Sequence, residues 1–165
     1  MNSADSFARA ELAQVFLVTH QIDRASIEFE KVTKDNQTSF EAYLGLSKIF
    51  LVKERLDLAI SQCDRAISID SRRPEGFAVR AQLYLKLCDF SRSVDAYSRA
   101  AKIASDSESK ASYLYLRGVV YYEMGQFELA VKDFSRSSRL RPNHAGAWVW
   151  RAAACSRLEL SLIHI

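Results

Sequence analysis

The side chains that could carry out acid–base or metal chemistry are few and scattered. The histidines are His20, His144 and His164. The first two fall in predicted turns, where a histidine is usually solvated. No GxSxG, GxxxxGK[ST] or HExxH motif occurs, and no carboxylate pair has catalytic spacing. We therefore predict no catalytic residues, no metal site and no cofactor, and we expect no enzymatic activity.

The cysteines indicate a reducing environment. Cys63, Cys88 and Cys155 are an odd set, and no CxxC pair is present, so neither a zinc site nor a thioredoxin-type site is expected. The start of the chain, Met1 to Phe7, lacks the basic-then-apolar pattern of a secretory signal. Free thiols without such a signal predict a cytoplasmic protein.

Three arginines, Arg80, Arg117 and Arg151, recur at steps of 37 and 34 residues, each just before a small residue. One interpretation is a ladder that binds anions. The other is structural: each stem packs between helices and its guanidinium pairs with an acid on the next helix, such as Asp133 or Asp95. We favour the structural interpretation because these positions lie on the predicted packing face.

Charge and composition exclude several classes of protein. The chain has 165 residues, 48% of them apolar, which is ordinary for a folded domain. A net charge of +3 is too small to indicate nucleic acid, and no apolar run is long enough to predict a membrane span. The basic pair Arg72–Arg73 is expected to be solvated at a turn.

The elements that must position these residues repeat along the chain. Small residues recur at Ala25, Ala59, Ser93 and Ala130, at steps of 34, 34 and 37 residues. Aromatic residues recur at the same period. The aromatic positions are Phe16, Phe50, Tyr84 and Tyr121. Within each period the apolar spacing is helical, with a short turn in the middle, so each unit is predicted to be a helical hairpin. One hairpin cannot bury both faces alone, and the hairpins must therefore stack.

The pattern resembles the tetratricopeptide repeat family over residues 6–159. It is clearest in one stretch that carries Leu114, Arg117, Gly118, Tyr121, Ala130, Phe134, Ser137 and Pro142. The resemblance implies an all-α, right-handed superhelical solenoid of antiparallel helix hairpins. Repeats are predicted at about 6–39, 40–73, 74–107 and 111–144, with a partial repeat at 145–159. The glycine that is usual in the inner turn is present only at Gly125, and Glu54 and Cys88 replace it in neighbouring repeats.

The last six residues, 160–165, do not fit this pattern. They resemble a translated sequencing-library adaptor, and counting 34 residues from Ala130 reaches His164 where a small residue is required. We therefore expect residues 160–165 to be a non-native tail and the chain to be a fragment of a longer repeat protein.

In this family the first helix of each hairpin generally lines a concave groove. The resemblance therefore implies a scaffold that binds peptide segments of partner proteins without catalysis. Residues off the packing columns would face the groove, among them Ala10, Gln14, Glu41 and Glu75. The predicted peptide-binding residues are Leu44, Lys48, Leu51, Gln82, Leu85, Tyr115, Val119 and Tyr122.

Some members of the family grip the carboxylate terminus of Hsp70 or Hsp90 with Lys, Asn and Arg. The aligned positions here are Leu44, Lys48, Val79, Ser112 and Leu116. Only Lys48 has suitable chemistry, so no such clamp is expected. The alternatives to a peptide scaffold are an RNA-binding helical repeat and a self-association module. The predicted groove carries about as many acids as bases, so nucleic acid is not expected as a partner. No membrane is expected as a partner either, because no apolar run is long enough to span one.

Overall fold

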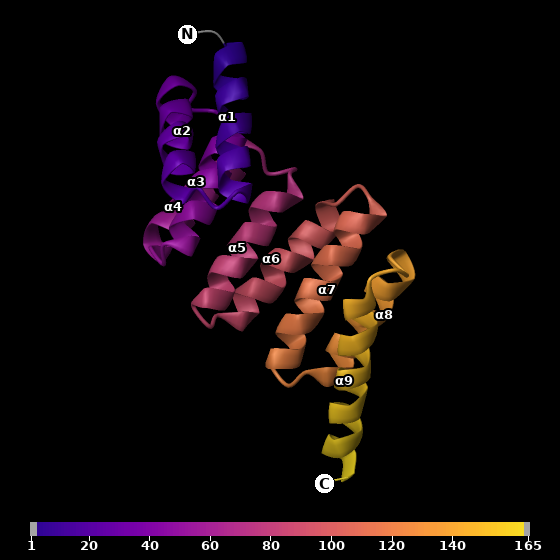
Figure 1. The fold of residues 1–165 in the computed structure, drawn as a ribbon. Helices are drawn as coiled ribbons and strands as arrows, with labels where there is room; N and C mark the ends of the chain where they lie inside the picture. Colours follow the sequence, from indigo (N-terminus) through magenta and orange to yellow (C-terminus); the bar gives the residue numbers. More distant parts are fainter. Residues whose placement is uncertain (1–2, 164–165) are drawn as a thin grey trace. The chain divides into compact units, whose positions relative to one another are not determined.

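In the computed structural model, which describes residues 3–163, the chain forms nine α-helices (Figure 1). Their bounds are α1 Ser3–Val18, α2 Ile22–Asp35, α3 Phe40–Val52, α4 Leu56–Ile69, α5 Pro74–Lys86, α6 Phe90–Ile103, α7 Ser107–Glu123, α8 Phe127–Leu140 and α9 Ala145–Ile163. No strand occurs between residues 3 and 163. Of the predicted tail, α9 contains residues 160–163, and His164 and Ile165 lie outside the described residues.

The chain divides into two compact units, Met1–Leu83 and Tyr84–Ile165. In the first unit, α1 packs on α2, α2 on α3 and α3 on α4. In the second unit, α6 packs on α7, α7 on α8 and α8 on α9. The helices bury the side chains that recur at helical spacing. In α2, for example, Ala25, Phe29 and Val32 lie on one buried face.

The turns inside the hairpins share one backbone geometry. His20, Glu54, Cys88 and Gly125 have φ values of 59°, 57°, 56° and 72°, all in the left-handed region. Each turn also has the double hydrogen bond of a Schellman cap. In the second turn, for example, the N–H of Glu54 donates to the carbonyl of Leu51 and the N–H of Arg55 to that of Phe50. Glycine is present at only one of the four positions.

Helices approach closely where glycine faces an aromatic ring. A Cβ atom on Gly45 of α3 would lie 2.4 Å from the ring of Phe29 on α2, and that ring is completely buried. A Cβ atom on Gly118 of α7 would lie 2.9 Å from the ring of Phe134 on α8. The missing side chains therefore make room for the rings that fill the core.

Small polar side chains also join neighbouring helices. The Ser47 hydroxyl on α3 donates to the Ala59 carbonyl on α4 at 2.8 Å, and both residues are buried. The thiol of Cys63 on α4 donates to the Gly76 carbonyl on α5 at 3.3 Å. These bonds satisfy buried polar groups and fix how the helices meet.

Two further properties bear on function. Among the described helices, none is both long and apolar enough to cross a membrane. The described residues contain no group of three or more His, Cys, Asp or Glu side chains that could hold a metal ion.

Candidate peptide-binding surface

A hollow of about 210 Å³ lies in the first unit, between α1, α3 and the start of α5. It brings together positions that the sequence assigned to the groove from three separate repeats. Its lining consists of Ala10, Glu11, Gln14, Phe40, Glu41, Leu44, Gly45, Lys48, Arg73 and Glu75. Of the eight predicted peptide-binding residues, the hollow contains Leu44 and Lys48.

Lys48 is the most unusual side chain in this hollow. It is half-buried on α3, and its ammonium group has no hydrogen bond or ion pair with the residues that the structure describes. Burial lowers the pKa of Lys48 below its ordinary value, and the nearby charge of Glu75 acts in the opposite direction. A partly desolvated cation without a partner favours a ligand that brings an acceptor.

Arg73 forms one wall of the hollow, and the prediction that it is solvated is wrong. Its guanidinium pairs with Glu41, lies 3.7 Å from a carboxylate oxygen of Glu75, and stands 4.1 Å from the centre of the Phe40 ring. Arg72, by contrast, is exposed, as expected. Sequence reasoning missed Arg73 because it treated the two arginines as one patch. The signal was its place directly before Pro74, which opens α5.

A second hollow of about 230 Å³ continues from the first along α1. The two share Ala10, Glu11 and Glu41. Several of its polar groups already have partners. Asn36 accepts hydrogen bonds from Thr38, and the Ser39 hydroxyl accepts one from the N–H of Ala42 in the first turn of α3. Because the two hollows share these lining residues, we name them together the α1–α3 groove.

The other predicted residues of the helices before α6 lie outside the lining of the α1–α3 groove. Leu51 is half-buried and packs against the core cluster that contains Cys63 and Leu83. Gln82 is exposed, and Leu85 is half-buried. Leu44 has two roles, because it lines the groove but is only 6% exposed and belongs to the same core cluster as Leu51.

In the second unit, Tyr115, Val119 and Tyr122 of α7 are half-buried rather than free on the surface. They pack against a core cluster formed by Ala130, Phe134 and Ala154, together with Trp150 of α9. The ring centres of Tyr122 and Trp150 are 5.1 Å apart, and those of Tyr115 and Phe134 are 5.8 Å apart. These side chains therefore stabilise the packing of α7, α8 and α9.

His144, which the sequence placed in a solvated turn, is half-buried beside the same cluster. Its ring meets that of Tyr115 edge to face, with the centres 4.7 Å apart. The contact helps to fix the turn before α9 on α7. An aromatic contact is therefore what the structure gives this histidine.

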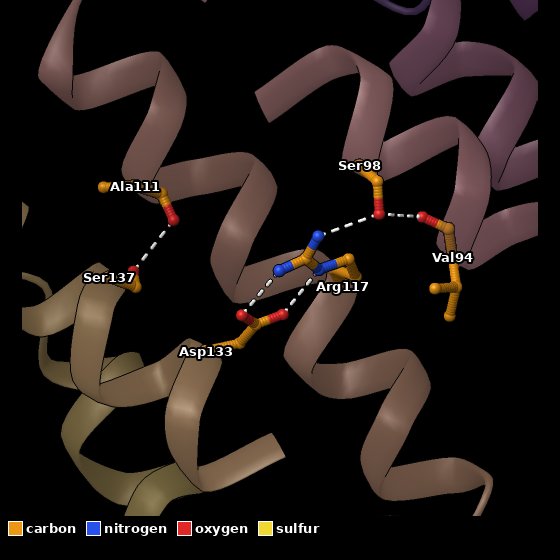
Figure 2. A network of polar contacts seen from close by, with 6 residues as sticks. All are labelled: Val94, Ser98, Ala111, Arg117, Asp133 and Ser137. Carbon is orange, nitrogen blue, oxygen red and sulfur yellow. Dashed lines mark hydrogen bonds and ion pairs between the residues drawn. The ribbon is translucent and has the colours of Figure 1, made fainter. Parts of the chain in front are cut away.

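The structural interpretation of the recurring arginines is confirmed at Arg117. Its guanidinium donates to both carboxylate oxygens of Asp133, at 2.6 and 2.7 Å, and to the Ser98 hydroxyl at 2.8 Å (Figure 2). The hydrogen bonds to Asp133 raise the pKa of Arg117 above its ordinary value.

The other two arginines differ in their partners. Arg80 lies 3.6 Å from Asp64, an acid of the preceding helix rather than of the next one. Arg151 stacks over the ring of Trp148 at 4.5 Å. None of the three arginines points to an anion-binding ladder.

Models of one protein family match the chain in two places. Both describe the tetratricopeptide repeat, and they match residues 10–74 and 111–144, together more than half of the chain. The chain belongs to the tetratricopeptide repeat (TPR) family. Tetratricopeptide repeat protein 16 of Macaca fascicularis is 32% identical over 103 residues, which are 60% of this chain and 12% of that protein. The human and mouse proteins of the same name are likewise covered over 12% and 14% of their lengths.

Solved structures show the same fold at low sequence identity. Pseudomonas aeruginosa pilF matches with a TM-score of 0.85 and 17% identity, over 95% of this chain and 70% of that one. YrrB, described as a TPR protein with an unusual peptide-binding site, matches with a TM-score of 0.71 and 18% identity, over 96% and 80%. These similarities confirm the predicted all-α, TPR-like fold.

Proposed function

We propose that the chain is a non-catalytic scaffold that binds extended peptide segments of partner proteins in the α1–α3 groove. The observation that carries this proposal is the convergence of groove positions from three repeats on one hollow, around the unpaired ammonium of Lys48. YrrB, a protein of the same fold, is described as having a peptide-binding site. The proposed location is the cytoplasm, where the free cysteines would remain reduced.

The chemistry of the groove defines the segment that it would accept. A carboxylate side chain of the peptide would meet Lys48, while its backbone would run along α1 past Gln14 and Glu11. A hydrogen bond to a charged group contributes about 1.5–3 kcal/mol, or roughly tenfold or more in affinity. The first hollow contains two cations and three carboxylates, a balance that favours a peptide over the phosphate backbone of RNA.

The test is a selection of binders from a random peptide library on the full chain, followed by fluorescence anisotropy with purified variants. Lys48→Gln should weaken the selected peptides roughly tenfold. Lys34→Gln removes the same charge from an exposed position in the last turn of α2 and should leave their affinity unchanged. Far-UV circular dichroism would verify that both variants fold. Selected peptides that bind Lys48→Gln as tightly as the parent chain would contradict the proposal.

A further inference from the structure

A second hollow of different chemistry lies in the second unit, where α7 begins and α8 ends. It has a volume of about 300 Å³ and is lined by Lys110, Arg136, Arg139 and Leu140. Three of these four residues are cations, and none is an acid. We call this the cationic hollow. It is formed by a single hairpin and shares no residue with the α1–α3 groove.

The backbone beneath the cationic hollow is firmly placed. The Ser137 hydroxyl of α8 donates to the Ala111 carbonyl of α7 at 2.8 Å, and both residues are buried (Figure 2). Lys110 and Arg136 directly precede these two residues in the sequence. This hydrogen bond therefore holds α7 and α8 together at the end of the hairpin that carries the cations.

The charges of the hollow are not neutralised within the described part of the chain. The side chains of Lys110 and Arg136 have no hydrogen-bond or ion-pair partner there, and Arg139 donates only to the Ser135 carbonyl. Glu108, in the same first turn of α7 as Lys110, pairs with Arg141 instead. The hollow therefore keeps its positive charge.

Helix dipoles explain only part of this arrangement. Arg139 lies in the last turn of α8, where a cation is favourable. Lys110 lies in the first turn of α7, where the positive end of the helix disfavours it. A lysine in that place, facing two arginines across a hollow, favours an anion that all three can share.

We infer that the cationic hollow binds a phosphorylated serine or threonine side chain of a partner protein. A phosphate monoester carries close to two negative charges and three acceptor oxygens, which match three cations better than a single carboxylate does. Arginine guanidinium groups bind such oxygens in pairs. Leu140, which is 38% exposed, gives an apolar contact for the residue beside the phosphate.

The probe is a short peptide, blocked at both ends, that carries phosphoserine between two leucines. Its affinity for the full chain would be measured by fluorescence anisotropy at physiological salt, beside the unphosphorylated peptide and a glutamate peptide. The phosphopeptide should bind at least tenfold more tightly than either. Arg136→Gln and Lys110→Gln should each weaken it roughly tenfold. Lys86→Gln removes one charge from an exposed residue outside the hollow and should change the affinity less than twofold.

Three results would overturn the inference. One is equal binding of the phosphorylated and unphosphorylated peptides, and another is full affinity in both Arg136→Gln and Lys110→Gln. The third is preference for another source of phosphate. Oligouridylate that binds more tightly than the phosphopeptide would identify a nucleic-acid site, and inorganic phosphate that binds as tightly would exclude a peptide site. None of these results depends on whether the α1–α3 groove binds peptides.

Discussion

Asp133 of α8 has both of its carboxylate oxygens occupied by Arg117 of α7, and Arg117 extends the contact to Ser98 of α6. The Ser98 hydroxyl in turn donates to the Val94 carbonyl one turn earlier in α6. Asp133 is 3% exposed and Arg117 is 17% exposed in their side chains. The ion pair thus joins α7 to α8, and the hydrogen bond to Ser98 adds α6, at a largely buried site of the second unit.

Removing one partner of this pair should be strongly destabilising. Asp133→Ala would leave the Arg117 charge buried without compensation, which we expect to lower the free energy of unfolding by about 3–5 kcal/mol. Urea denaturation followed by circular dichroism would measure this. Asp64→Ala is the matched control, because Asp64 is 55% exposed and lies 3.6 Å from Arg80. Its loss should cost less than about 1 kcal/mol. Equal losses in the two variants would show that burial of the pair does not matter.

Gly45 should tolerate no side chain. Gly45→Ala would place a Cβ atom 2.4 Å from the completely buried ring of Phe29, so we expect a loss of about 1–3 kcal/mol from overpacking. Gly146→Ala makes the same change in α9, where the nearest atoms would be 3.4 Å away. There the better helix propensity of alanine should leave stability unchanged or raise it by up to about 1 kcal/mol. Thermal denaturation would compare the two variants, and a stable Gly45→Ala chain would contradict the close approach.

At the turn positions with positive φ, introducing glycine should stabilise the fold and removing it should destabilise the fold. Glu54→Gly and Cys88→Gly would relieve left-handed strain at φ values of 57° and 56°, and each should raise the free energy of unfolding by up to about 1 kcal/mol. Gly125→Ala introduces that strain at φ 72° and should lower it by about 1 kcal/mol. Denaturant midpoints of the three variants would measure both signs. A destabilising Cys88→Gly would show that the thiol contributes more than the backbone strain costs.

Stability should fall at alkaline pH because of two buried acids. Burial raises the pKa of Cys63 from its ordinary 9.0 to about 12, and that of Tyr97 from 10.0 to about 12. The unfolded chain therefore loses these protons before the folded chain does. The contribution of Cys63 is therefore complete below pH 9 and that of Tyr97 below pH 10. Above those values each contribution declines by about 1.4 kcal/mol per pH unit as the pH rises toward 12.

The two groups can be separated by variants. Cys63→Ala should flatten the decline between pH 9 and 10, while Tyr97→Phe should change the slope only above pH 10. Urea midpoints at several pH values would measure both slopes. An unchanged slope in Cys63→Ala would mean that the thiol is accessible to hydroxide in the folded chain.

A peptide ending in EEVD should not bind tightly. Of the positions aligned with the carboxylate clamp, Lys48 alone is a cation, and Leu44 beside it is largely buried. We expect no micromolar binding by isothermal titration calorimetry, with the C-terminally amidated peptide as control. Micromolar affinity that Lys48→Ala abolishes would show that a clamp exists.

The repeat period in the sequence was enough to predict the helices and their main packing faces. It was not enough to predict which side chains meet across helices of different hairpins. Helical spacing and the repeating small residues predicted helix hairpins, and the acid on the next helix predicted the partner of Arg117. The aromatic packing of Tyr122 could not be predicted, because Trp150 comes from α9 and the spacing within one repeat does not show which rings meet. The contacts of Arg73 also lie outside what the period determines, since Phe40 and Glu41 begin the helix of the preceding hairpin.

The hydroxyl of Ser47 determines more than the packing of α3 on α4. Its bond to the Ala59 carbonyl is one of the contacts that hold α3 in its orientation, and the next residue in the sequence is Lys48. An alanine in place of Ser47 would leave the residues that line the groove unchanged and yet remove one of the contacts that hold α3 on α4. The proposed recognition by the Lys48 ammonium would therefore depend on a buried hydrogen bond made by the residue before it in the chain.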